Sequence, residues 1–314
     1  MFDRFTSQST PTLLKERFPL LTEYSCALPH RLIKVSGDDR VDFLNRVLTQ
    51  NVPTQETDGI FSWAALCNPQ GRVLAAFRML AQPESVWMVV EHEQADMMLQ
   101  TLDRYVLRSH VEIALDPDPL VGRAGFASPP LVSESASDLV FAGQDVPGES
   151  IHRSIFIDRT AGLTDTQETE SGSHWSALDF WLGIPHILPG SSGRFIPQAL
   201  NLIDLGAVSL RKGCYPGQEI IARTTYRGHA KRSLVLFETT MPATSCTPLL
   251  DASSGVETVW VLDSCTSSSG EIWVQAVIED RALRSDTDDH AIHRLALPSG
   301  MTGDYRLVRA FKAV

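Results

Sequence analysis

The expected secondary structure changes in kind near Lys231, and this change limits the possible folds more than any other feature of the chain. Before Lys231, strand-like patterns alternate with helix-like patterns. After it, the regular patterns are strand-like and are separated by clusters of Gly, Ser and Pro, which is typical of a small antiparallel barrel or sandwich. We therefore expect two domains, residues 1–230 and 231–314. The strand-like stretches of the second domain are residues 233–237, 257–262, 272–278 and 305–311.

The first domain contains a stretch that predicts a compact α+β lobe made of two antiparallel strands, a third strand, a helix and a fourth strand. Its centre is a hairpin whose turn is Asn68-Pro69-Gln70-Gly71. Farther on, residues 164–173 read as an acidic, polar loop, and a short helix containing Trp175 is expected to end at Gly183. In the lobe, strands are expected at residues 61–67, 73–80, 86–90 and 111–114, and a helix at about 93–106. Before it, a short strand is expected at residues 32–35 and a helix at about 41–48.

Charge and hydropathy exclude several classes of protein. The chain has 314 residues with 27 basic and 38 acidic side chains, a formal net charge of −11. Phosphate binding depends on Lys and Arg density, so we expect no direct contact with nucleic acid. No apolar run approaches the roughly 18 residues of a membrane-spanning helix, and the first residues lack the apolar core of a secretory signal. We therefore expect no membrane contact and a cytoplasmic location.

The five cysteines are scattered, odd in number and never spaced as C-x-x-C. This pattern argues against a disulfide scaffold and against a zinc or iron–sulfur site made by this chain alone. We expect no metal site. Most of the thiols are expected to be small core residues.

A basic segment interrupts this acidic chain between Arg211 and Arg232. Its 22 residues hold six bases and one acid, so the segment carries +5 and the rest of the chain −16. From residue 233 to residue 280 there are seven acids and no Lys or Arg. A local excess of positive charge in an acidic protein marks a place where an anion can be held.

Cys214 lies inside this basic segment, between Gly213 and Gly217 and next to Lys212. Helix-like sequence begins at about Gly217, so the cysteine is expected just before a helix N-terminus. A neighbouring ammonium group and a helix N-terminus both favour the thiolate over the thiol. We interpret Cys214 as a reactive thiol supported by Lys212. The alternative is that Cys214 fills a turn between domains and that the bases form a solvated seam.

Several motifs resemble the YgfZ family, whose members are folate-binding proteins related to the glycine-cleavage T-protein and implicated in iron–sulfur cluster maturation. The most specific is K-G-C-Y-x-G-Q-E at residues 212–219, which continues with Arg223, Tyr226, Arg227-Gly228 and Lys231-Arg232. About a dozen fixed positions that include a cysteine rarely occur together by chance. Further similar motifs lie at residues 36–52, 67–73, 105–109 and 195–202.

The resemblance implies an α+β, T-protein-like fold of three lobes around a central folate channel. It places a ferredoxin-like lobe at about residues 55–115 and a C-terminal β-barrel after Lys231. It also implies tetrahydrofolate, or a one-carbon derivative, as the cofactor. The residues expected to contact the folate are Trp175, Gln218, Glu219, Arg223, Tyr226 and His30. Some relatives have an aromatic residue at the position of His30. Because this chain has a histidine there, stacking of the folate ring on that residue is less expected.

Plainer interpretations exist for most of these residues. Trp175 on an apolar helix face is often simply core, Glu219 and Arg223 are spaced to pair with each other along a helix, and Tyr226 is as well suited to packing as to binding.

Three functions compete. In the first, folate and the thiol of Cys214, held by Lys212, assist assembly or repair of iron–sulfur clusters on client enzymes or with assembly proteins, and so support tRNA modification indirectly. In the second, the chain is a folate-dependent aminomethyltransferase of the T-protein type. In the third, it is a scaffold with a degenerate folate cleft. A cysteine in place of the T-protein's R-T-G-Y-T-G-E type of motif favours the first.

Overall fold

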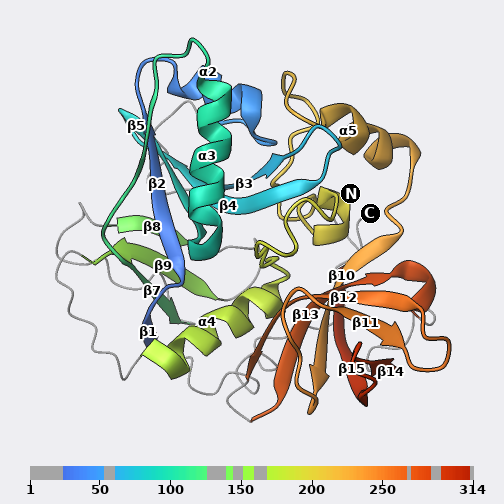
Figure 1. Cartoon of the computed structure of the whole chain (residues 1–314). Helices are drawn as coiled ribbons and strands as arrows, with labels where there is room; N and C mark the ends of the chain where they lie inside the picture. Colours follow the sequence, from blue (N-terminus) through green and yellow to red (C-terminus); the bar gives the residue numbers. More distant parts are fainter. Residues whose placement is uncertain are drawn as a thin grey trace.

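Three β-sheets meet around α4 and the segment that follows it, and together they form a mixed α+β fold (Figure 1). The computed structural model describes residues 24–52, 61–125, 139–143, 151–158, 168–266, 270–283 and 291–311. Within these residues, no helix combines the length and the apolar character needed to cross a bilayer.

The first sheet has five antiparallel strands in the order β3-β4-β5-β2-β6. Two helices, α2 and α3, bury apolar side chains such as Phe43 and Met98 against it. The bounds are β2 (His30–Ser36), α2 (Arg40–Val47), β3 (Ser62–Cys67), β4 (Val73–Ala81), β5 (Ser85–Glu91), η1 (His92–Gln94), α3 (Ala95–Val106) and β6 (Glu112–Leu115). The expected range of about 55–115 covers four of these strands. Because β2 lies between β5 and β6, residues 30–36 also belong to this sheet.

The second sheet is a feature that the sequence patterns do not indicate. Its four antiparallel strands, in the order β1-β7-β9-β8, are β1 (Tyr24–Ala27), β7 (Leu120–Gly125), β8 (Leu139–Gly143) and β9 (His152–Ile157). Helix α4 (Glu168–Leu182) packs on this sheet, where Gly122 leaves room for the Trp175 ring. The helix ends at Gly183 as predicted, but it begins at Glu168, so the polar loop expected over residues 164–173 is wrong from Glu168 onward.

The third sheet is a closed antiparallel barrel of six strands, in the order β10-β13-β12-β11-β14-β15. The barrel expected after Lys231 is thereby confirmed, and closure removes the exposed strand edges that favour aggregation. Two short strands, β11 and β14, were not expected. The bounds are β10 (Arg232–Thr239), β11 (Pro248–Asp251), β12 (Glu257–Thr266), β13 (Ile272–Glu279), η4 (Asp280–Ala282), β14 (Ile292–Ala296) and β15 (Thr302–Phe311).

One hydrophobic core joins α4 to the barrel and to the segment between them. Trp181 of α4 stacks on Trp273 of β13 with ring centroids 5.9 Å apart, and Leu234 and Phe311 belong to the same cluster. The connecting segment contains η3 (Pro197–Leu200) and leads to α5 (Gln218–Arg227), which lies beside the β3–β4 turn (Figure 1). This core fixes the position of the charged groups described next.

Candidate functional site

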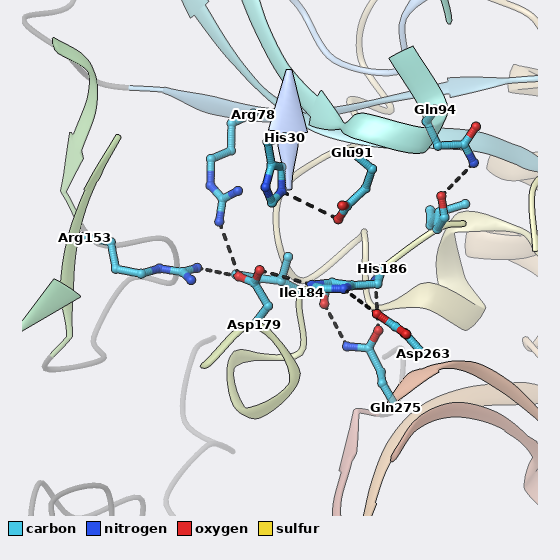
Figure 2. A network of polar contacts seen from close by, with 11 residues as sticks. His30, Arg78, Glu91, Gln94, Arg153, Asp179, Ile184, His186, Asp263 and Gln275 are labelled. Atoms are coloured by element: carbon cyan, nitrogen blue, oxygen red, sulfur yellow. Dashed lines mark hydrogen bonds and ion pairs between the residues drawn. The ribbon is translucent and has the colours of Figure 1, made fainter. Parts of the chain in front are cut away.

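A cluster of buried charged side chains lies where the three sheets meet (Figure 2). Asp179 of α4 is its centre, and its Oδ1 accepts hydrogen bonds from Arg153 Nη2 of β9 at 2.7 Å and from Arg78 Nη2 of β4 at 3.4 Å. Its Oδ2 lies 3.1 Å from Nε2 of His186. All four side chains are buried, and burial of charges is tolerated only when they are paired. Asp179 therefore joins elements of the first and second sheets to α4.

His186 carries the cluster on to the barrel. Its Nδ1 lies 3.0 Å from Oδ2 of Asp263 on β12. Gln275 of β13 holds the same loop, because its Oε1 accepts from the His186 backbone N–H at 2.8 Å and its Nε2 donates to the Ile184 carbonyl at 2.7 Å. The residues that follow α4 are thus tied to two barrel strands.

The protonation states follow from these contacts. Burial alone would raise the pKa of Asp179, but Arg153, His186 and Arg78 together hold it well below its usual range. Burial opposes protonation of His186, but the nearby Glu91 and the hydrogen bonds to Asp179 and Asp263 raise its pKa well above the ordinary value. His186 is therefore an imidazolium that donates from both ring nitrogens.

A small cavity lies beside the cluster and has a volume of about 10 Å³. Its lining includes His30, Trp63, Arg78, Glu91 and Asp179. His30 Nε2 lies 3.6 Å from Glu91 Oε1, whereas His30 Nδ1 is buried and has no hydrogen-bond partner in the parts of the chain that the structure describes. Burial lowers the pKa of His30, so its ring is neutral. A cavity of this size holds about one water molecule.

Two of the residues expected to bind folate lie in this central region. His30 lines the cavity. Trp175 is fully buried in the core between Gly122 and the Arg153 guanidinium, whose carbon lies 4.3 Å from the ring centroid, and it is not among the residues that line the cavity.

The Cys214 segment lies on the turn between β3 and β4. Gly217 adopts a φ of +80°, and a Cβ placed there would lie 2.4 Å from the Gly71 Cα and 2.6 Å from the Asn68 carbonyl oxygen. Only glycine allows this approach of two backbones. Gln218 Nε2 donates to the Lys212 carbonyl at 3.2 Å and closes the loop around Cys214.

Lys212 anchors this loop to the segment that follows α2. Its ammonium group donates to the carbonyl oxygens of Leu48 at 2.7 Å and Gln50 at 2.9 Å, and no hydrogen bond joins it to Cys214 among the residues that the structure describes. Burial lowers the pKa of Lys212 to about 8. The side chain therefore holds the loop in place.

Cys214 is the exposed thiol among the five cysteines, since Cys26 and Cys67 are buried and Cys246 and Cys265 are half-buried. Burial raises the pKa of Cys67 to about 12, which makes that thiol a poor nucleophile.

Helix α5 presents the other predicted residues to solvent next to Cys214. Glu219 and Arg223 are exposed, and Tyr226 is 68% exposed. Glu219 and Arg223 do not form an ion pair within 4.0 Å. Within the described parts of the chain, four bases of this segment have no carboxylate within 4.0 Å: Arg211, Arg223, Arg227 and Lys231. We call this exposed surface, from Arg211 to Lys231, the Cys214 surface.

The central cavity and the Cys214 surface are separate places. Trp63 lines the cavity near the start of β3, and Cys67 ends that strand beside Tyr215. Four residues of strand span about 13 Å. The structure therefore brings His30 close to the charged cluster. The other predicted residues lie in the Cys214 loop and on α5: Lys212, Cys214, Gln218, Glu219, Arg223 and Tyr226.

The charged cluster does not follow from local sequence patterns, because most of its members are far apart along the chain. A signal was nevertheless present. Arg78 and Asp179 each interrupt an otherwise apolar stretch, in VLAAFRMLA and SALDFWL. A lone charge in such a stretch is buried only if the fold supplies a partner.

A reduced folate fits the residue types around the cavity. Its pterin needs carboxylates or amides for its N–H groups and an aromatic face. Glu91 and Asp179 supply carboxylates, Trp63 supplies an aromatic ring, and the unpartnered His30 Nδ1 is a further polar contact. The volume of about 10 Å³ does not hold a pterin, so binding requires these side chains to move apart.

The chain folds into three sheets, one of them a closed six-strand barrel, which surround a buried ionic cluster. This arrangement defines a protein of the glycine-cleavage T-protein class of fold. The solved structure of the glycine cleavage system aminomethyltransferase T from Bartonella henselae matches 94% of this chain and 88% of that one, with a TM-score of 0.66 and 14% sequence identity. At that identity the similarity shows the fold alone.

Sequence comparison narrows the class to a family. The tRNA-modifying protein YgfZ of Yersinia enterocolitica (serotype O:8 / biotype 1B) is 31% identical over 301 residues, 87% of this chain and 91% of the relative. YgfZ of Klebsiella pneumoniae (strain 342) is 34% identical over 223 residues, 65% of this chain and 67% of the relative. No family model matches the chain. The chain belongs to the YgfZ family, as its motifs predicted.

Proposed function

We propose that the chain is a folate-dependent cytoplasmic accessory protein that assists iron–sulfur cluster assembly or repair on client enzymes through the thiol of Cys214. Its relatives are named as tRNA-modifying proteins. In this proposal the link to tRNA is indirect and passes through the client enzymes, because a chain of net charge −11 is poorly suited to hold RNA.

The observation that carries the proposal is the exposure of Cys214 on a rigid, positively charged surface. Lys212, Gly217 and Gln218 fix the loop through main-chain contacts, so the thiol is held in one place. Four bases of the Cys214 surface, Arg211, Arg223, Arg227 and Lys231, have no carboxylate within 4.0 Å in the described residues. Unpaired positive charge on this surface attracts an anionic partner.

The central cavity is the proposed place for the pterin ring. A bound reduced folate would supply one-carbon or reducing chemistry. His30 and Glu91 would hold the ring, and Asp179 would stay fixed by Arg78 and Arg153. Arg223, Tyr226 and Gln218 remain proposed contacts for the anionic tail. Gln218 and Glu219 were expected at the pterin edge, and with the ring in the central cavity the Glu219 carboxylate takes no part in binding. Trp175 is buried against the Arg153 guanidinium, and its proposed role is to hold Arg153 in position.

Calorimetric titration of tetrahydrofolate into the full chain tests this placement. We expect saturable binding that Glu91→Gln weakens at least tenfold, because this variant removes a carboxylate from the cavity. Glu219→Gln makes the same chemical change on α5 and is the matched control. No binding to the wild-type chain would remove the cofactor from the proposal, and a loss confined to Glu219→Gln would place the ring at α5.

Complementation tests the thiol. In a strain that lacks its own YgfZ protein, we expect the wild-type chain to restore the tRNA modification and Cys214→Ser to fail while folding normally. Cys246→Ser removes a half-buried thiol and serves as the control. Full rescue by Cys214→Ser would favour the scaffold function.

The same purified protein distinguishes the aminomethyltransferase alternative. We expect no tetrahydrofolate-dependent release of ammonia from an aminomethylated carrier protein. Turnover that survives Cys214→Ser would favour that alternative.

A further inference from the structure

A surface hollow of about 480 Å³ lies apart from the central cavity. Its lining comes from the C-terminal ends of α2 and α3 and from the residues that follow α3. It is lined by Arg46, Tyr105, Leu107, Arg108 and Ser109. Residues 105–109 form one of the sequence motifs, and neither the charged cluster nor the Cys214 surface accounts for it. Its volume lies in the range of ligand and peptide pockets.

Leu107 is held in an unfavourable conformation at this hollow. It follows the last residue of α3 with a φ of +41°, and its side chain is 89% exposed. Residues with a Cβ avoid positive φ, and glycine is the usual residue at such a position. The chain therefore uses a strained leucine to place an apolar side chain in water. Strain of this kind gathers at functional positions.

Two arginines flank the leucine without an acidic partner. Arg46 Nη2 donates to Ser109 Oγ at 2.8 Å, which holds the guanidinium in place. Neither Arg46 nor Arg108 has a carboxylate within 4.0 Å in the parts of the chain that the structure describes. Arginine and tyrosine are enriched where partner proteins bind most strongly.

We propose that this hollow docks an acidic segment of a partner protein. A carboxylate of the partner lies between Arg46 and Arg108, and an apolar side chain beside it packs on Leu107 and Tyr105. Opposite charge favours this occupant. The exposed leucine favours protein over nucleic acid, because an apolar side chain adds nothing to a phosphate contact and the chain as a whole is acidic.

Photocrosslinking tests the proposal independently of folate and of Cys214. The full chain is expressed in its native host cells with p-benzoylphenylalanine in place of Tyr105. The control carries the same probe at Ile292, which is 62% exposed on the barrel. We expect a protein adduct specific to position 105, with the linked residue next to Asp or Glu. An RNA adduct, or no adduct, would overturn the proposal.

The identified partner, once purified, is then titrated against variants. Arg108→Glu is expected to raise the Kd at least tenfold, and Arg294→Glu, which makes the same change of charge on the barrel, to leave it unchanged. Leu107→Gly relieves the positive φ, so we expect equal or greater thermal stability together with at least fivefold weaker binding. Wild-type affinity in both Arg108→Glu and Leu107→Gly would exclude the hollow as the docking site.

Discussion

At the scale of single residues, Asp179 contacts more of the buried charged side chains than any other member of the cluster. Arg78, Arg153 and His186 all direct a donor at its carboxylate. With Glu91 and Asp263 the region holds three positive and three negative groups, so each charge is compensated. Such a cluster is costly to break, because every remaining group stays buried.

Asp179→Asn should therefore destabilise the protein strongly. Loss of the carboxylate leaves two guanidinium groups and an imidazolium without their shared partner, and removal of one member of a buried pair costs about 3–5 kcal/mol. Urea unfolding measures the change. Asp42→Asn, on the exposed side of α2, is the control and should stay within about 0.5 kcal/mol of the wild type. Equal stability of the two variants would contradict the role of Asp179.

His186 should make stability depend on pH. Its pKa in the folded chain lies above the value of about 6.5 for an unfolded histidine. The stabilisation is therefore complete below about pH 6.5 and is lost as the pH rises through the folded value. We expect the urea midpoint of the wild type to fall more between pH 6 and pH 9 than that of His186→Gln.

If the urea midpoints of the wild type and of His186→Gln fall equally between pH 6 and pH 9, His186 is not the source of the pH dependence. If His186→Gln does not fold, a nitrogen-correlated NMR titration of the imidazole in the wild type follows the same proton directly. We expect both ring N–H signals to persist at pH 7.

At the scale of elements, the contact between the Cys214 loop and the β3–β4 turn determines where the thiol sits. Gly217→Ala should be destabilising, because its positive φ costs a residue with a Cβ about 1–2 kcal/mol and the added methyl group meets the backbone of Gly71. Gly213→Ala is the matched control, since nothing lies within 4 Å of a Cβ there.

The measurements are the Tm and the rate at which Cys214 reacts with a disulfide reagent. Gly217→Ala should lower the Tm and change the rate, and Gly213→Ala should change neither. An unaltered rate in Gly217→Ala would mean that the turn does not position the thiol.

How well each element could be predicted depends on how local its signal is. The hairpin around Asn68, the helix that ends at Gly183 and four barrel strands follow from periodicity and turn residues within a short window. The second sheet does not, because its strands are short and one of them, β1, pairs with β7 across more than 90 residues. Likewise the Cys214 surface was found from one basic segment, whereas the charged cluster joins four distant residues.

At the scale of the whole molecule, the barrel is part of the central core and part of the charged cluster. Trp273 stacks on Trp181, Asp263 binds His186, and Gln275 binds the loop after α4. A chain ending at residue 230 would expose the apolar face of α4 and leave His186 without one of its carboxylates.

We therefore expect residues 1–230 expressed alone to lack a cooperative thermal transition and to be cut rapidly by protease, whereas the full chain resists. Circular dichroism and limited proteolysis test this, with the full chain as the control. A cooperative transition in the shortened chain would show that residues 1–230 are an independent domain.

The position of Asp179 also determines how the molecule can open. One carboxylate binds β4, β9 and the loop fixed to β12. If any one of the three sheets moves away, the carboxylate loses a contact and its bonds to the other two sheets are weakened. Widening of the central cavity is therefore a concerted motion. Amide hydrogens in β4, β9 and β12 should exchange with solvent deuterium as one cooperative unit, although these strands lie far apart in the chain.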